Sequence, residues 1–277
     1  MAARCRRRCR AERRKAFGFA GPGAETLPAR GTPPDPRWAS RSADLRASGT
    51  TMRSTREGGD EAEMSSNGKD PAERLAGAGA DAERAFERRI GPTLDLAGQA
   101  DAITAACHAM AVRFHQGGKL VVFGTGSAST DAQHVAVEFV HPVIVGKRAL
   151  PAISLTTDVA TVTGVAERDG LDAIFSHQIR YLAAPSDIAL GICAGPDSPS
   201  VLAGLVTAKE LGLLTIALAS GDGGAIAASP AVDHPLLANS ADPRVVKEIH
   251  VTIYHVLWEL VHVFFEQPGV LAPGVVA

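Results

Sequence analysis

Two residues that can transfer protons, His134 and Glu138, lie four positions apart in a segment with helical character. Residues at this spacing point from one face of a helix, so the imidazole and the carboxylate would lie side by side. The pair can act as a general acid and base. It can equally be an ordinary polar pair on a helix surface, which stabilises a helix by about 0.2–0.5 kcal/mol.

The residues that precede this predicted helix help to decide between a proton-transferring pair and an ordinary surface pair. Residues 120–123 (LVVF) are typical of a buried strand, residues 124–127 (GTGS) predict a tight turn, and we expect the helix to start near Thr130. A helix N-terminus behind such a turn has free N–H groups and a positive dipole end, so it can bind an anion. Many α/β proteins contain this arrangement, and the pair His134 and Glu138 makes it more specific.

Other candidate residues lie farther along the chain. A long helix predicted at residues 243–265 has four polar residues on one stripe, namely Glu248, His255, Glu259 and His262. We interpret Glu259 and His262 as part of a solvated or interface face. Cys193 ends a predicted strand before a helix, where a thiol can become reactive, although a buried and inert thiol is the favoured interpretation. Asp158 is expected to cap the helix that follows it.

The elements that position these residues alternate between strand and helix. Apolar runs predict five strands, at residues 120–123, 152–156, 187–192, 213–218 and 232–237. Helical sequences separate them, and two further helices are predicted at residues 71–90 and 93–116. Such alternation predicts an α/β fold with a parallel sheet that is flanked by helices on both faces.

Ligands of open parallel sheets bind at the carboxyl ends of the strands. Here those ends are residues 124–129, 156–158, 193–198 and 220–224. None of them contains a Gly-x-Gly-x-x-Gly sequence, and the chain has no Walker sequence. A dinucleotide-binding fold and a P-loop nucleotidase are therefore not expected.

Charge separates the beginning of the chain from the rest. Of the 28 basic and 30 acidic residues, 14 and 8 lie in residues 1–63, so the remainder carries a net charge of −8. The first segment is rich in Arg, Gly and Pro and has almost no apolar run, which is typical of disorder. We therefore expect a disordered tail at residues 1–65, one domain at residues 66–267, and a short tail at residues 268–277. The acidic domain argues against direct binding of nucleic acid.

The role of the first tail stays open among three interpretations. It can be a transit peptide, a nucleic-acid arm, or upstream sequence outside the working protein, with Met52 or Met64 as the true start. No apolar run is long enough for a membrane span, so no membrane partner is expected. The four cysteines have neither metal-site nor disulfide spacing, which fits a reducing cytoplasm.

The sequence resembles a known family, the sugar isomerase (SIS) domain, and within it the phosphoheptose isomerases. The resemblance extends from about residue 72 to residue 266 and is carried by GTGSASTDAQHVAVEF, LPAISLTTD, GICAGPDSPSVL, GDGGAIA and KEIHVTIYHVLWELV. It implies a flavodoxin-like three-layer sandwich around a five-stranded parallel sheet. It also implies homotetramers with active sites between subunits, and conversion of sedoheptulose 7-phosphate to a heptose 7-phosphate, often with a zinc ion.

The resemblance assigns roles to three residues of the first sheet helix and the closing helix. Glu138 would be the base that removes the proton beside the carbonyl, and His255 would transfer protons on the oxygen. His134, Glu138 and His255 would bind the metal. The further substrate-binding positions would be Thr125, Gly126, Ser127, Ser129, Asp158, Ser198 and Lys247.

The sequence departs from the family at the metal and phosphate positions. Lys247 replaces the family's Gln, and an ammonium cannot donate a lone pair to zinc, so a zinc site is doubted. We expect Lys247 to pair with Glu138, to make it a poorer base and to repel the metal, which leaves the protein zinc-free and barely active. The family's loop Ser-Thr-Ser-Gly-Asn-Ser is CAGPDS at residues 193–198, which removes hydroxyl donors and adds an acid. Ala128 and Pro142 also replace the family's Ser and Arg.

Two functions are compatible with this pattern. One is an aldose–ketose isomerase of a phosphorylated or related sugar, which resembles phosphoheptose isomerase. The alternative is a non-catalytic SIS-domain protein that binds a carbohydrate derivative or takes part in assembly. The kept residues Glu138, His134 and His255 favour the first, whereas Lys247 and the altered loop favour the second.

Overall fold

The computed structural model describes residues 71–195, 197–267 and 269–271, which all belong to one compact unit, Gly68–Ala277. The tail predicted at residues 1–65, and most of the one at residues 268–277, lies outside the described residues. Among the described helices, none combines the length and the apolar character that crossing a membrane requires.

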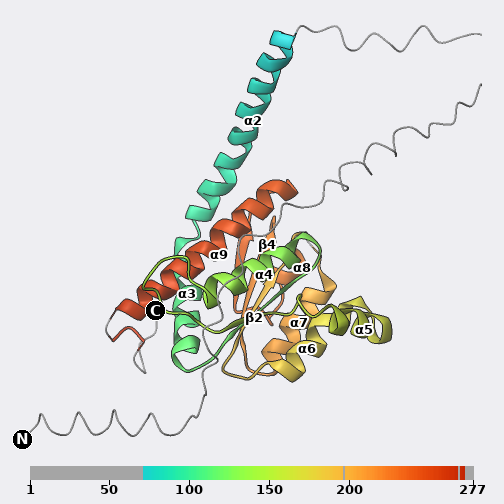
Figure 1. Cartoon of the computed structure of the whole chain (residues 1–277), viewed down its shortest axis with the longest axis vertical. Helices are drawn as coiled ribbons and strands as arrows, with labels where there is room; N and C mark the ends of the chain where they lie inside the picture. Colours follow the sequence, from blue (N-terminus) through green and yellow to red (C-terminus); the bar gives the residue numbers. More distant parts are fainter. Residues whose placement is uncertain (1–70, 196, 268, 272–277) are drawn as a thin grey trace, which may run out of the picture. The chain divides into compact units, whose positions relative to one another are not determined.

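The core of the unit is a parallel sheet of five strands (Figure 1). The strands are β1 (Leu120–Gly124), β2 (Ala152–Ser154), β3 (Ile188–Ile192), β4 (Leu214–Ser220) and β5 (His234–Ala238). Their order across the sheet is β2-β1-β3-β4-β5, and every neighbouring pair is parallel. The predicted fold class and strand count are confirmed.

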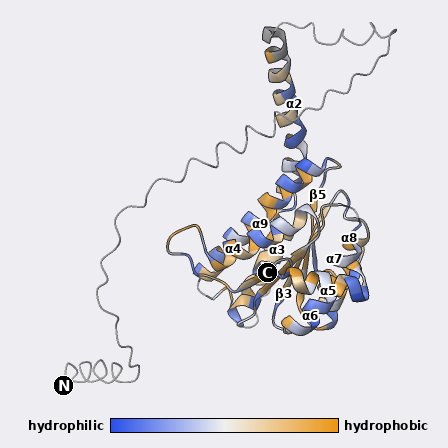
Figure 2. Ribbon diagram, turned by 45° about the vertical axis from the view of Figure 1, so that its right-hand side comes forward, coloured by the Kyte–Doolittle hydropathy of each residue, from blue (hydrophilic) through white to orange (hydrophobic). Residues whose placement is uncertain are grey.

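Helices cover both faces of this sheet. One face packs against α3 (Ala100–His115), α4 (Ser127–Val140) and α9 (Pro243–Glu266). The other packs against α5 (Val159–Asp169), α6 (Ile174–Leu182), α7 (Pro199–Glu210) and the short α8 (Gly224–Ala227). Alternate strand residues enter the two cores, as the pleat requires: Val122 belongs to the first core and Val121 to the second. Figure 2 shows the hydrophobic colour concentrated on these strands and on the inward helix faces.

The sheet has its topological switch point between β1 and β3. The chain leaves β1 towards β2 and then crosses back to β3, while Gly124 at the end of β1 stands beside Ile192 at the end of β3. The turn after β1 and the loop after β3 therefore lie next to each other. A Cβ at Gly124 would lie 2.8 Å from the carbonyl oxygen of Ile192 and 2.9 Å from Cβ of Ala128, so only glycine fits where α4 approaches the sheet.

The N-terminal helix differs from the prediction. The sequence predicted a break near residue 91, but α2 (Pro71–Ala97) continues through Pro92 and ends before the turn at Gly98 and Gln99. Proline removes one backbone N–H from the ladder, and Thr93 Oγ1 bonds the carbonyl oxygen of Arg89 at 2.7 Å within the same turn. The surface position of this helix lets solvent reach the carbonyl group that proline leaves unpaired.

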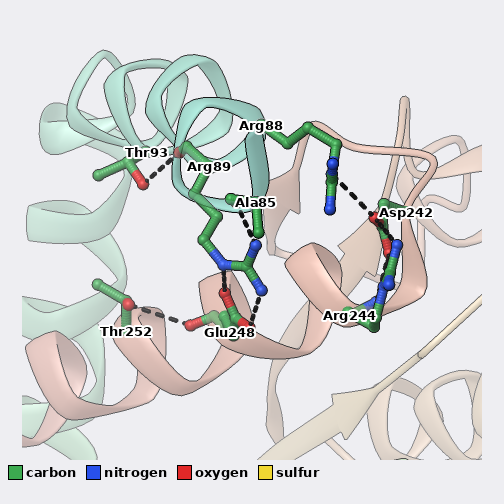
Figure 3. Close-up of polar contacts among 8 residues, drawn as sticks. All are labelled: Ala85, Arg88, Arg89, Thr93, Asp242, Arg244, Glu248 and Thr252. Atoms are coloured by element: carbon green, nitrogen blue, oxygen red, sulfur yellow. Dashed lines mark hydrogen bonds and ion pairs between the residues drawn. The ribbon is translucent and has the colours of Figure 1, made fainter. Parts of the chain in front are cut away.

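Ion pairs tie the second half of α2 to the start of α9 (Figure 3). Arg89 Nε and Nη2 lie 2.6 and 2.7 Å from the two carboxylate oxygens of Glu248, which is a bidentate pair. Beside it, Asp242 caps α9 through the Arg244 N–H and also receives the Arg244 guanidinium. The contacts fix where α9 begins, and with it the position of the residues on its first three turns.

Candidate functional site

Three residues from two helices converge at one place. His134 and Glu138 extend from α4 and His255 extends from α9, and one ligand atom from each lies within 4.8 Å of the other two. His134 Nε2 lies 3.1 Å from Glu138 Oε1, and the His134 and His255 rings lie 5.5 Å apart in an edge-to-face arrangement. Within the described residues, this is the group of His, Cys, Asp and Glu side chains whose geometry suits a metal ion.

The group is open to solvent on one side. The side chain of His134 is 44% exposed and that of Glu138 is 12% exposed, while His255 is an exposed residue. A small molecule can therefore reach the imidazoles, whereas the carboxylate is largely shielded from water. Shielding strengthens the electrostatic interactions of a carboxylate with whatever binds beside it.

Three polar contacts join α4 to α9 around this group. Lys247 Nζ lies 2.7 Å from Asp131 Oδ1, and the Tyr254 hydroxyl lies 2.9 Å from His134 Nδ1. One turn later, Trp258 Nε1 donates to the backbone oxygen of Glu138 at 3.0 Å. The contacts follow one another along both helices, so they hold the two helices in a single register.

Lys247 does not occupy the position that the sequence led us to expect. It was predicted to pair with Glu138, but its ammonium pairs with Asp131 and also lies 3.2 Å from the backbone oxygen of Ser127. Glu138 bonds His134 instead. The physical reason is the position of Lys247 on α9: it lies about two turns before His255, so its ammonium reaches the start of α4 and meets the nearly buried carboxylate of Asp131 there.

This correction removes the basis for the predicted repulsion of a metal. An ammonium that is paired with a carboxylate at 2.7 Å presents little net charge to a site farther along the helices. His134, Glu138 and His255 supply two imidazole nitrogens and a carboxylate oxygen, which is the donor set of a three-ligand catalytic zinc site. The described side chains therefore fit a divalent cation without the family's fourth ligand.

The turn after β1, where several substrate-binding residues were predicted, borders a pocket of its own. Thr125, Gly126 and Ser129 line a pocket of about 310 Å³ together with Thr156. Gly126 has φ 59° and ψ −126°, a conformation that side-chain-bearing residues rarely adopt. The helix begins at Ser127 rather than at Thr130, so the positive end of its dipole lies at this turn, although the N–H groups of Ala128 and Ser129 already donate to the carbonyl oxygens of Thr125 and Gly126.

Two predicted substrate residues occupy N-cap positions of helices, and of these Asp158 makes a side-chain cap bond. Asp158 accepts from the Thr161 N–H at the start of α5, as expected, and bonds with the Thr161 side chain lower the pKa of its carboxyl. It lines a different pocket, of about 510 Å³, from that of Thr125. Ser198 is the N-cap residue of α7 and is partly exposed beside the switch point.

The loop after β3 presents little that binds an anion. Ala194 and Gly195 line a pocket of about 730 Å³ with residues of the loops after β4 and β5, including Asp222 and Asn239. Cys193, before them, is 1% exposed, and burial raises the pKa of its thiol to about 12. The expected burial of Cys193 is confirmed, and the inertness of its thiol stays a prediction.

Sequence reasoning missed Asp131, Tyr254 and Trp258. The first lies one turn before His134 on the same helix face, and the other two flank His255 on α9. Tyr254 is 1% exposed, and burial together with the nearby carboxylates of Asp131 and Glu138 raises its pKa to about 12. The signal in the sequence that could have pointed to Tyr254 is its position directly before His255, a predicted site residue.

Comparison with known proteins agrees with this geometry. Residues 86–220 match the SIS domain family. A phosphoheptose isomerase of Solidesulfovibrio magneticus is 41% identical over 175 residues, which cover 63% of this chain and 84% of the relative. The chain belongs to the phosphoheptose isomerase-like SIS-domain family.

Solved structures of the family show the same fold. The chain matches a phosphoheptose isomerase from Francisella tularensis with a TM-score of 0.63 and 31% identity, over 67% of this chain and 98% of that one. It matches the phosphoheptose isomerase from Neisseria gonorrhoeae with a TM-score of 0.59 and 26% identity, over 69% and 98%. These relatives are named phosphoheptose isomerases, so the non-catalytic alternative is not favoured.

Proposed function

We propose that this protein is an aldose–ketose isomerase of a sugar phosphate, with a heptose 7-phosphate as its substrate. The observation that carries the proposal is the convergence of Glu138 with His134 and His255 from two helices. A shielded carboxylate and an exposed imidazole within a few ångströms are the groups that an enediol mechanism needs. The similarity to named phosphoheptose isomerases supports the choice of substrate.

In the proposed mechanism, Glu138 takes the proton from the carbon next to the substrate carbonyl. His255 donates a proton to the carbonyl oxygen, so the carbon–carbon bond gains double-bond character and a neutral enediol forms. His255 then takes the proton of the neighbouring hydroxyl, and Glu138 returns its proton to the carbon that carried the carbonyl. Each group ends in its starting protonation state, so the cycle is balanced.

We further propose that His134, Glu138 and His255 can hold a divalent cation, with zinc as the expected metal. Such an ion would polarise the substrate oxygens and stabilise developing negative charge. His134 Nδ1 contacts the Tyr254 hydroxyl, which leaves Nε2, now facing Glu138, as the nitrogen that would bind the ion.

The phosphate would lie at the switch point, between the turn at Thr125 and the start of α7. Support comes from the positive dipole ends of two helices, from the side chains of Ser127, Ser129 and Ser198, and from the partly exposed ammonium of Lys247. Asp158 would contact the sugar only if the ligand extends toward the neighbouring pocket. The exposed Asp197 lies in the loop after β3 and weakens the site for a dianion, so we expect a higher KM than a hydroxyl-rich loop would give.

We also propose a homotetramer. On α2 four large apolar side chains are exposed, with Phe86 at 73% and Leu94 at 67%, alongside Leu75 and Ile90. An apolar pocket of about 320 Å³ lies where α2 and α3 meet α9, and its lining residues Thr252 and Val256 flank His255 in the sequence. A partner subunit on this surface would border the site. Light scattering of the chain from Met64 should give four subunits, and a monomer at micromolar concentration would contradict the proposal.

The proposal also covers the cellular compartment of the protein and its relation to nucleic acid. We place it in the cytoplasm, because Cys107 and Cys193, the described cysteines, are free thiols, which fits a reducing compartment. The net charge of −8 outside residues 1–63 supports the view that the domain does not bind nucleic acid directly.

The decisive experiment is the conversion of sedoheptulose 7-phosphate by the unmodified protein and by Glu138→Gln. We expect turnover in the first and a loss of about 10²–10⁴-fold in kcat in the second, because the amide cannot accept the carbon-bound proton. Glu259→Gln is the matched control, since Glu259 is an exposed glutamate one turn beyond His255 on the same helix. A folded protein without turnover, or a Glu138→Gln variant with full turnover, would refute the proposal.

A further inference from the structure

Tyr254 has a buried ring and a hydroxyl group that contacts a residue of the candidate site. Its residue is 1% exposed, and its hydroxyl lies 2.9 Å from His134 Nδ1. Its ring also lies edge-to-face with those of His134, at 5.4 Å, and His255, at 4.8 Å. Tyr254 therefore contacts both histidines of the group, although its hydroxyl does not belong to the donor set.

Both ring nitrogens of His134 are engaged. Nδ1 faces the Tyr254 hydroxyl, and Nε2 faces Glu138 Oε1 at 3.1 Å. An ionised carboxylate only accepts hydrogen bonds, so the hydrogen between His134 and Glu138 belongs to Nε2. A neutral imidazole then has a lone pair on Nδ1, and the tyrosine hydroxyl donates to it.

A cation bound at Nε2 reverses this arrangement. The lone pair of Nε2 would then be used by the metal, so the ring hydrogen must lie on Nδ1. A tyrosine hydroxyl can accept as well as donate, so the same contact survives with its direction reversed. A phenylalanine would fill the same space but would leave Nδ1 without this partner in both states.

We propose that Tyr254 is a positioning residue that fixes the ring orientation of His134 for a divalent cation, and that its hydroxyl serves both tautomers of that ring. The inference rests on the proposed metal-assisted isomerase, since it assigns a role in that same site. Partners of this kind orient a metal-binding histidine and raise its basicity, and their loss typically weakens metal binding by about 10–100-fold. Packing alone does not require the hydroxyl, because the ring already fills the buried space.

The test compares Tyr254→Phe with Tyr181→Phe in the full chain. Tyr181 is the other tyrosine, is 76% exposed and lies on α6, so it controls for the loss of a phenol hydroxyl. Zinc is titrated in competition with a coloured chelator. We expect Tyr254→Phe to weaken zinc binding by about 10–100-fold and Tyr181→Phe to leave it unchanged. Equal affinity in a folded Tyr254→Phe protein would overturn the inference.

A second measurement does not need the metal. In the metal-free protein, nitrogen NMR should show His134 with its hydrogen on Nε2 and a hydrogen-bonded Nδ1, correlated with a slowly exchanging Tyr254 hydroxyl proton. Tyr254→Phe should shift the Nδ1 resonance and remove that correlation. If the unmodified protein binds no zinc, the metal part of the proposed function fails, and this spectrum alone decides the role of Tyr254. An Nδ1 resonance that does not respond to the substitution refutes it.

Discussion

The contact between Lys247 and Asp131 predicts that removing one partner costs more than removing the other. The two side chains are not equally buried, since that of Asp131 is 8% exposed and that of Lys247 is 41% exposed. Lys247→Met would leave a nearly buried carboxylate without its cation. Asp131→Asn would leave an ammonium that can turn toward water. We therefore expect the lysine substitution to be the more destabilising of the two.

The magnitudes follow from these exposures. Removing one partner of a fully buried pair costs about 3–5 kcal/mol, whereas an exposed pair contributes about 0.2–1 kcal/mol. Lys247 is too exposed for the first value, because water screens its charge. We expect a loss of about 1–3 kcal/mol for Lys247→Met and about 0.5–1.5 kcal/mol for Asp131→Asn. For a domain of this size, the first corresponds to a fall in Tm of about 2–12 °C.

Urea denaturation of both single variants and of the double variant measures these costs, at one protein concentration because assembly contributes to stability. Lys209→Met is the matched control. Lys209 pairs with Asp233, its side chain is 43% exposed, and Asp233 is 28% exposed and also bonded by Thr215. Its loss should therefore be smaller than that of Lys247→Met. The reasoning is wrong if Asp131→Asn costs as much as Lys247→Met, or if the double variant shows no coupling.

Two further predictions concern titrating groups. Bonds from Arg244 hold the pKa of Asp242 at about 2, so the stability that this carboxylate contributes is fully present above its ordinary pKa and is lost as the pH falls through about 2. An NMR titration should find this value, and Arg244→Ala should raise the pKa of Asp242 only part of the way to the ordinary range, because the backbone N–H of residue 244 still donates to the carboxylate. Burial raises the pKa of Cys193 to about 12, so after Cys5→Ser and Cys9→Ser a thiol reagent at pH 8 should label the native protein only when denaturant is added. Labelling of the native protein at the rate of a free thiol would contradict this.

Much of the fold could be predicted because local signals agree with the global architecture. The strand at β1 is an unbroken apolar run, and it is buried on both faces of the sheet. The end of α4 was located by Pro142, two residues after Val140. The helix break that we predicted near residue 91 was wrong, because Gly91 and Pro92 are not enough to end a long helix. Pro92 costs one backbone bond, and the rest of α2 carries the helix past it.

The candidate site was only partly predictable. His134 and Glu138 were found because their spacing places them on one helix face, and His255 was found by resemblance. The partner of Lys247 was not found, because a flexible four-carbon side chain can reach several carboxylates and the sequence does not say which one is nearest. Tyr254 was missed for a related reason: its role depends on a contact between residues 120 positions apart.

The chemistry of the site depends on how α4 and α9 are aligned. α4 follows β1, α9 follows β5, and the two helices run in the same direction. Residues 131, 134 and 138 of α4 contact residues 247, 254 and 258 of α9, in that order. The contact residues are three and four positions apart on α4, and seven and four positions apart on α9. These spacings place all the contact residues of each helix on one face of that helix. A slip of one turn, about 5.4 Å, would break all three contacts and separate His255 from Glu138.

Alignment of this kind cannot come from the polar contacts alone, because each is worth only about 0.5–1.5 kcal/mol. The apolar faces of both helices supply the larger force. Val135 and Phe139 of α4 and Ile253 and Leu257 of α9 are almost fully buried in one core. That core sets the distance and angle of the helices, and the three polar contacts select the register within it. The convergence of His134, Glu138 and His255 is therefore a consequence of packing on one face of the sheet.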